Sequence, residues 1–149
     1  FDANGGLVQA EARIAYADQR TRGKDMIQLS GGSVLVSWID ENTHHVHYSL
    51  LSKAGSTWTS GAVFELTPGY QFGAINLSVT SDHYDHGIIT WAEELGNRTL
   101  NYALVGPSGN MLTPPMVFLS GTGLDTNAAG QGNAPYDGQS YISLPLLFR

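Results

Sequence analysis

Hydrophobic and polar positions alternate along several short segments of the chain. The alternation is clearest in residues 44–52, where every second residue from Val46 to Leu50 is apolar, as in a strand with one buried face. Residues 33–40 are apolar almost throughout, which is typical of a strand covered on both faces. Clusters of Gly, Asp, Asn, Thr and Ser separate these segments. The pattern predicts four strands, at about 25–30, 33–40, 44–52 and 57–66.

The same pattern recurs further along the chain. Trp38 and Trp91 stand at equivalent places in two apolar segments and are 53 residues apart. Tyr48 corresponds in the same way to Tyr102, and a glycine follows each tyrosine at the same distance. Four strands in about 50 residues, repeated in tandem, are typical of β-propeller blades. We therefore predict an all-β fold of tandem four-stranded antiparallel blades of a β-propeller, incomplete in this chain.

The repeat divides the chain into parts of one β-repeat region. Residues 1–20 are expected to end one blade, 21–68 and 69–120 to form complete blades, and 121–149 to start a further blade. Residues 7–20 also keep apolar residues at helical spacing, so a helix is the alternative to the strand that the repeat favours there. Fewer than three repeats do not close a ring, so we expect the remaining blades in further sequence or in other copies of the chain.

Composition and charge narrow the class of protein. Charged residues make up 13% of the chain and hydrophobic residues 42%, which is compatible with a buried core and argues against disorder. A net charge of −6 with only two lysines argues against nucleic-acid binding. Apolar segments are too short for a membrane helix, so no membrane insertion is expected. The chain has no cysteine, and we expect an extracellular or cell-surface protein, with Asn76 and Asn97 as candidate glycosylation sites.

A family resemblance rests on the motifs of each repeat. Trp-x-[Asp/Glu], a following aliphatic-x-Tyr strand and a glycine turn make residues 1–120 resemble sialidase-like (BNR-type) β-propeller repeats. Gly55-Ser-Thr-Trp58 fits the second half of the Asp-box Ser-x-Asp-x-Gly-x-Thr-Trp, whereas Lys53 replaces its aspartate and Leu51 its serine. The resemblance implies a propeller fold and a place for Trp58 between blades. It does not carry sialidase chemistry over to this chain.

The recurring aromatic and acidic residues point to structural roles. Because Trp38 and Trp91 lie at equivalent places inside apolar strands, we expect both to pack in the core, and we expect the same of Tyr48 and Tyr102. Asp40 and Glu93 follow them at strand ends, where we expect the carboxylates to cap turn amides rather than to catalyse. Trp58 comes directly after a turn and is a candidate for ligand contact.

Two clusters contain histidine. His45 and His47 are two residues apart on a predicted strand, a spacing that can bind a transition metal. The second cluster fills one predicted turn, and its candidate ligand-binding residues are Asp82, His83, Asp85 and His86. Successive turns of a meander lie at opposite ends of the sheet, so we expect the two clusters to be far apart. Solvated turn residues are the simpler interpretation of both.

Motifs for catalysis are missing from the sequence. It contains no Gly-x-Ser-x-Gly, no phosphate-binding glycine loop and no His-Glu-x-x-His. The segment 121–133 offers Asp125 and Asn127 as candidate calcium ligands, although no regular calcium loop is spelled out. No cofactor is therefore predicted, with calcium as the alternative.

The sequence favours a non-catalytic extracellular module of a larger surface or secreted β-propeller protein. It would act by adhesion, assembly or ligand binding, with carbohydrate as the ligand class considered. Two alternatives remain open. One is a fragment of a carbohydrate-active propeller enzyme, a glycoside hydrolase or lyase, whose catalytic residues lie on other blades. The other is a small lectin that closes its ring by oligomerising.

Overall fold

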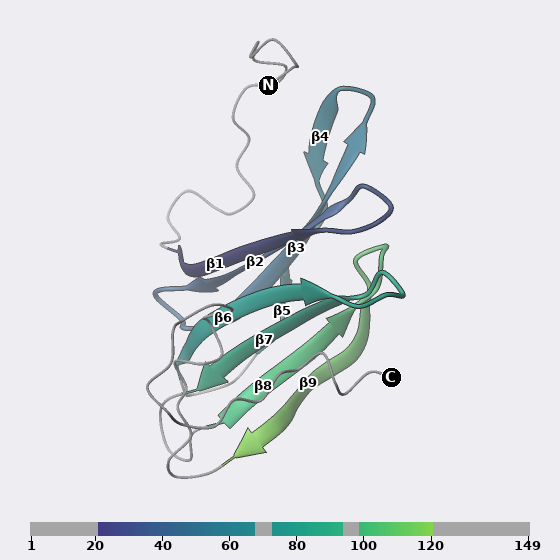
Figure 1. The fold of residues 1–149 in the computed structure, drawn as a ribbon. Coiled ribbons are helices and arrows are strands. Elements are labelled where there is room, and N and C mark those ends of the chain that lie inside the picture. Colours follow the sequence, from purple (N-terminus) through teal and green to yellow (C-terminus); the bar gives the residue numbers. More distant parts are fainter. Residues whose placement is uncertain (1–20, 68–72, 94–98, 121–149) are drawn as a thin grey trace, which may run out of the picture.

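The computed structural model describes residues 21–67, 73–93 and 99–120, and this part of the chain is all-β without a helix (Figure 1). The first sheet contains β1 (Thr21–Gln28), β2 (Val34–Asp40), β3 (Val46–Ala54), β4 (Thr57–Ser60) and β5 (Phe64–Glu65). The second sheet contains β6 (Ala74–Ser81), β7 (Gly87–Glu93), β8 (Thr99–Val105) and β9 (Met111–Ser120). The described residues include no helix that is long and apolar enough to cross a membrane.

Both sheets are antiparallel meanders. The strand order is β1-β2-β3-β4 in the first sheet, where β5 also pairs with β3, and β6-β7-β8-β9 in the second. Apart from the pairing of β5 with β3, neighbouring strands are consecutive in the chain and need only short turns between them, which follows from the turn-forming clusters in the sequence. The predicted fourth strand at 57–66 is divided into β4 and β5 in the structure, because its register with β3 shifts by one residue between Ser60 and Phe64.

The backbone repeats in detail between the two sheets. The register of β1 with β2 shifts between Arg22 and Asp25, and that of β6 with β7 shifts at the equivalent place. Gly23 and Asn76, 53 residues apart, occupy these bulges with φ of 51° and 49°. The positive φ suits glycine and is tolerated by asparagine better than by most other residues. The repeat seen in the sequence is therefore also a repeat of local conformation.

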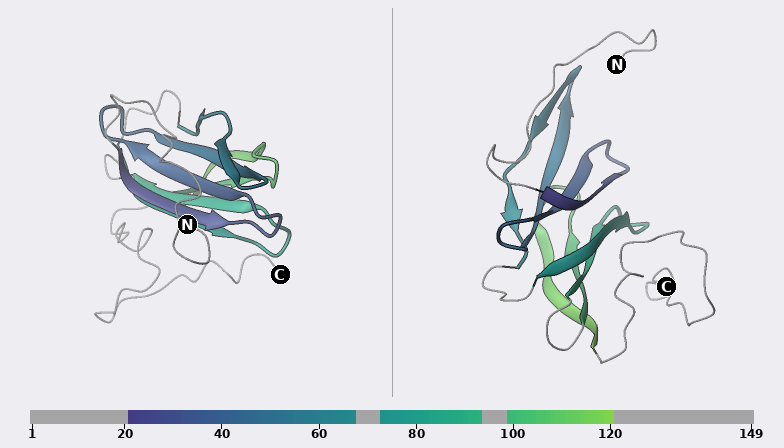
Figure 2. Two further views of the ribbon diagram at one scale, coloured as in Figure 1. Left: turned by 90° about the horizontal axis from the view of Figure 1, so that it is seen from above. Right: turned by 90° about the vertical axis from the view of Figure 1, so that its left-hand side faces the viewer.

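The two sheets pack face to face around one hydrophobic core (Figures 1 and 2). The first sheet contributes side chains of β2 and β3, and the second contributes side chains of β6, β7 and β8. The buried core residues from the strands are Leu35, Ile39, Val46 and Tyr48 from the first sheet, and Ala74, Leu77, Val79, Ile89, Trp91, Ala103 and Val105 from the second. Burial of these apolar side chains is the main force that holds the sheets together.

The two repeats use opposite faces in this contact. Leu35 and Ile39 of β2 lie in the core, whereas the equivalent residues of β7, Ile88 and Ala92, lie on the other face of the second sheet. Trp91 of β7 lies in the core, whereas its equivalent Trp38 lies on the other face of the first sheet. The repeats are thus stacked head to tail. We call the two faces that point away from this core the outer faces.

The tryptophans and tyrosines of the repeat are buried to different degrees. Trp38 and Trp91 are both buried, which confirms the expected packing role. Tyr48 is fully buried between the sheets, and its hydroxyl donates to Gly109 O at 3.1 Å. Tyr102, on the outer face of the second sheet, is half-buried, so the expectation of a core position holds for it only in part.

Gly87 of β7 lies directly against the side chain of Leu35 of β2. A β-carbon there would overlap Cδ2 of Leu35, so we expect Gly87→Ala to lower the free energy of unfolding by about 1–3 kcal/mol through overpacking. Urea denaturation followed by tryptophan fluorescence measures the loss.

Gly31→Ala is the matched control, because a β-carbon at Gly31 would have its nearest neighbour, Asp85 Oδ2, at 3.8 Å. Equal losses for the two variants would contradict the close packing of Leu35 on Gly87.

Candidate functional site

The two clusters singled out in the sequence lie at opposite ends of β6. His44, in the turn between β2 and β3, accepts from Ala74 N, the first residue of β6, at 3.1 Å through its carbonyl. Asp82 comes directly after Ser81, the last residue of β6. A strand of eight residues separates the two ends by roughly 25 Å. The histidines near β3 and the turn after β6 therefore belong to separate sites.

Asp82 organises the turn that joins β6 to β7. Its Oδ1 accepts from Tyr84 N and from His86 N, both at 2.9 Å, and its Oδ2 lies 2.9 Å from His86 Nδ1. Burial alone would raise the pKa of Asp82, but the hydrogen bonds from His86 and Tyr84 together outweigh it and hold the pKa below its ordinary value. The carboxylate is thus engaged within its own turn.

Asp85 joins this turn to the first sheet. It adopts φ of 66°, and its Oδ1 accepts from Ser30 N at 2.5 Å while Oδ2 accepts from Gly31 N at 3.3 Å. The hydrogen bond from the Ser30 amide is the main cause that lowers the pKa of this carboxyl group. Asp85 therefore satisfies amides in the turn between β1 and β2, and the two turns lie side by side.

Aromatic rings extend outward from the same turn. The rings of His83 and Tyr84 lie 3.8 Å apart between centroids, tilted by 41°, and the His86 ring is 6.0 Å from that of Tyr84. Tyr84 is 67% exposed. Of the candidate residues at 82–86, Asp82 and Asp85 are thus engaged in backbone contacts, whereas His83 and the neighbouring Tyr84 offer rings to the solvent.

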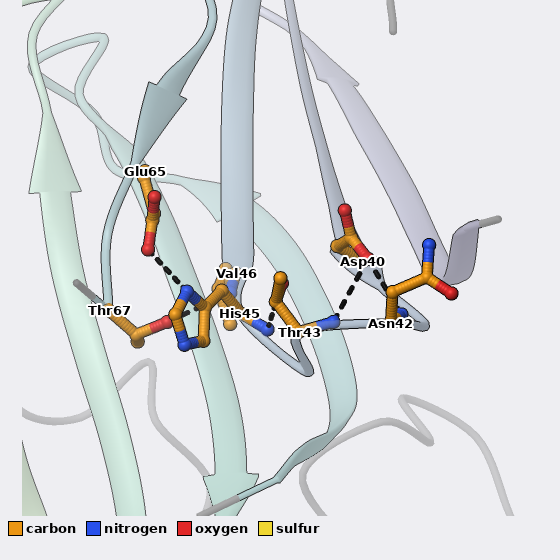
Figure 3. Close-up of polar contacts among 7 residues, drawn as sticks. All are labelled: Asp40, Asn42, Thr43, His45, Val46, Glu65 and Thr67. Atoms are coloured by element: carbon orange, nitrogen blue, oxygen red, sulfur yellow. Dashed lines mark hydrogen bonds and ion pairs between the residues drawn. The ribbon is translucent and has the colours of Figure 1, made fainter. Parts of the chain in front are cut away.

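The turn between β2 and β3 is stabilised by side chains of the strands around it (Figure 3). Asp40 Oδ1 accepts from Asn42 N at 2.7 Å and from Thr43 N at 3.2 Å, as expected for a carboxylate that caps a turn. His45 Nδ1 pairs with Glu65 Oε1 and so ties the turn to β5.

His47 points to the outer face of the first sheet. Its ring stacks on Trp38 with 5.9 Å between centroids and 15° between planes. Burial lowers the pKa of His47, and the nearby carboxylates of Glu65 and Asp40 oppose only part of this shift. His45 and His47 thus face different neighbours. Within residues 21–67, 73–93 and 99–120, no group of three His, Asp or Glu side chains is placed to hold a metal ion.

Glu93 differs from its equivalent Asp40. Its Oε1 accepts from Trp91 Nε1 and its Oε2 from Thr99 Oγ1, both at 3.4 Å, and burial raises its pKa. By contrast, Nε1 of Trp38 is buried without a hydrogen-bond partner in the described part of the chain. The longer glutamate side chain reaches the indole, and the shorter aspartate is engaged by its turn.

The remaining candidates are scattered. Trp58 lies half-buried on β4, in the hairpin that projects from the first sheet (Figure 1), and Lys53 Nζ lies 5.8 Å from its ring centroid. Asn76 is half-buried in the bulge of β6. Three candidates lie outside the described residues: Asn97, Asp125 and Asn127.

Two charged residues between the sheets were not identified from the sequence. Asp25 Oδ2 accepts from Val79 N at 2.7 Å and from Ser78 Oγ at 3.2 Å. Arg22 Nη2 donates to Ala74 O at 3.0 Å and lies 2.5 Å from His44 Nδ1. The one available signal was a difference between the repeats, since the equivalents of Asp25 and Arg22 are uncharged.

The sequence matches no family model and no curated protein in the comparisons made. The function is therefore inferred from the geometry alone.

The Asp85 carboxylate makes stability depend on pH. Because the folded state lowers its pKa below the reference of 3.8, its contribution is present above that pH and is lost as the pH falls through the folded-state pKa. In Asp85→Asn this contribution is absent at every pH, so we expect a shallower loss of unfolding free energy on acidification.

Urea denaturation of both proteins between about pH 2.5 and pH 6 gives the comparison. Asp82 titrates in both proteins, and because its charge raises the pKa of Asp85, the difference between them includes this repulsion. Parallel curves for the two proteins would contradict the role given to Asp85.

Proposed function

We propose that this chain is a non-catalytic structural and binding module of a β-propeller, in which its two repeats are consecutive blades of a larger extracellular or cell-surface protein. The observation that carries the proposal is the head-to-tail packing of the two sheets. A contact between two different faces leaves one face of each kind at the ends of the stack. Further blades extend such a stack until it closes into a ring.

The polar groups of the described residues support a structural role rather than catalysis. The carboxylates of Asp25 and Asp85 join the two sheets, and that of Asp40 caps a turn. The raised pKa of Glu93 is explained by burial beside Trp91 and Thr99, with which it forms hydrogen bonds. Each of these acids thus has a structural partner and is assigned no catalytic role, whereas a glycoside hydrolase or lyase with its catalytic residues on other blades stays the alternative.

Disulfide formation tests the head-to-tail packing, and the chain has no cysteine of its own to interfere. Asp25 Oδ2 and Ser78 Oγ are 3.2 Å apart across the contact, so we expect Asp25→Cys/Ser78→Cys to form an intramolecular disulfide under mild oxidation. Non-reducing electrophoresis and mass spectrometry detect it.

The matched control is Met26→Cys/Ser78→Cys, because Met26 is 66% exposed and points to the outer face of β1. Equal oxidation rates for the two pairs would refute the packing and, with it, the proposed blade arrangement.

Carbohydrate is the ligand class that we propose for the turn at residues 82–86. The exposed rings of His83 and Tyr84 offer an apolar surface beside polar groups, which suits stacking on a sugar ring. On a glycan array we expect wild-type binding and, for Tyr84→Ala, a loss of roughly tenfold or more in affinity.

Val117→Ala is the control, because it truncates an exposed side chain away from this turn, on β9. We expect it to bind like the wild type. Binding that survives in Tyr84→Ala, or turnover of glycosides by the wild type, would count against this assignment.

A further inference from the structure

The contact between the two sheets contains features that do not recur at equivalent positions of the other repeat. The first of these features is the close contact between Leu35 and Gly87. Cδ2 of Leu35 occupies the space in which a β-carbon of Gly87 would lie. The residue of the first sheet equivalent to Gly87 is Val34, which has a branched side chain. The residue of the second sheet equivalent to Leu35 is Ile88. The outer faces therefore place bulky residues at both of these positions.

The two carboxylates in the contact, of Asp85 and Asp25, also have no acidic equivalent in the other repeat. Asp85 accepts from Ser30 N at 2.5 Å, and its equivalent in the first sheet is Gly32, which has no side chain. Asp25 accepts from Val79 N at 2.7 Å, and its equivalent in the second sheet is Ser78, which is uncharged. Charge-assisted hydrogen bonds to amides are stronger than neutral ones, so a contact without these two acids would be weaker.

Other features of the contact are shared by both repeats. The Tyr48 hydroxyl donates to Gly109 O at 3.1 Å, and the outer face of the second sheet carries Tyr102 at the equivalent place. The outer face of the first sheet offers Gly55 at the place of Gly109, with φ of 63° against 83°. The hydrogen bond from tyrosine to a turn glycine is thus a feature of the repeat, whereas the Gly87 gap and the two acids are not.

The outer face of the second sheet is apolar along β8 and β9. Tyr102 and Leu104 of β8 are half-buried, and Met116 of β9 is 47% exposed. The other face of the same sheet already packs on the first repeat. The outer face carries Tyr102, the equivalent of the tyrosine that donates to Gly109. Its chemistry therefore fits another repeat of the same fold.

We infer that the outer face of β6–β9 binds a further, non-identical repeat of its own protein, one with glycine at the position of Gly87 and aspartate at the position of Asp85. It does not bind the first repeat of a second copy of this chain. In that copy Val34 would occupy the space that Ile88 needs, and Gly32 would leave the amide of His83 without a carboxylate. The inference rests on the proposed function and selects blades of the same protein over a ring made of identical copies.

The test gives the first sheet the features that it lacks. In the full chain, Gly32→Asp/Val34→Gly places an aspartate and a glycine on its outer face; Gly32 has φ of 85°, near the 66° at which Asp85 stands. By sedimentation velocity over a concentration series, we expect no self-association of the wild type. We expect the double variant to associate, with an apparent Kd at least about tenfold below the highest concentration at which the wild type stays monomeric.

Gly32→Asp/Val36→Gly is the control, because Val36 lies on the same face of β2 as Val34 but is equivalent to Ile89 rather than Gly87. It should sediment like the wild type. Adding Tyr102→Phe to the double variant should reduce its association, since the shared hydrogen bond is then missing. Near-UV circular dichroism confirms that each variant is folded.

Wild-type chain that already associates, with Tyr102→Phe weakening the association, would overturn the inference and favour a ring of copies. A folded double variant that sediments like its control would overturn it as well. The disulfide pair at positions 25 and 78 reports on the packing inside one chain, so failure of the blade arrangement is distinguishable from failure of this inference.

Discussion

The close approach of Leu35 to Gly87 is the constraint on which the arrangement of the two sheets depends. A leucine methyl group occupies space that any side chain at position 87 would need, so a larger residue there would force Leu35 to move. In the same contact Tyr48 of the neighbouring strand donates to the carbonyl of Gly109. Apolar burial supplies most of the stabilisation, and the small residue determines how near the sheets lie.

Polar groups then fix the ends of the contact. Asp25 bonds to β6 near its bulge, Asp85 bonds to the turn between β1 and β2, and Arg22 bonds to the first residue of β6. The bonds of Asp25 and Arg22 to β6 satisfy partly buried backbone atoms, so their loss would cost more than a surface ion pair, whereas the bonds of Asp85 to Ser30 and Gly31 are exposed. The repeats share a backbone conformation, yet the side chains that join them differ. Such differences let tandem repeats of one fold pack in a fixed order.

Much of the fold could be predicted from the sequence because periodicity reports directly on strands. The alternation in β3 and the apolar run in β2 gave their places to within two residues, and the equivalence of Trp38 with Trp91 gave the repeat. The division between β4 and β5 could not be predicted, since it follows from a one-residue shift of register against β3 that the alternation does not show.

The direction of packing and most of the polar contacts could not be predicted either. Both faces of β2 are apolar, so the pattern does not indicate which of them meets the next sheet. The acceptor roles of Asp25 and Asp85 depend on backbone amides more than 50 residues away, and an amide leaves no mark in the sequence. The histidines of the turn at residues 82–86 suggested a site there, whereas the contact of this turn with the first sheet is made by Asp85.

The head-to-tail packing is the central claim, and nuclear Overhauser effects in the wild-type chain test it most directly. The structure predicts a strong effect between the Leu35 methyl protons and the α-protons of Gly87, because a β-carbon at Gly87 would overlap the Leu35 side chain. It also predicts none between the Ile88 methyl protons and the first sheet. Effects from Ile88 to Leu35 or Val46, with none to Gly87, would show that the sheets meet through equivalent faces and would contradict the account.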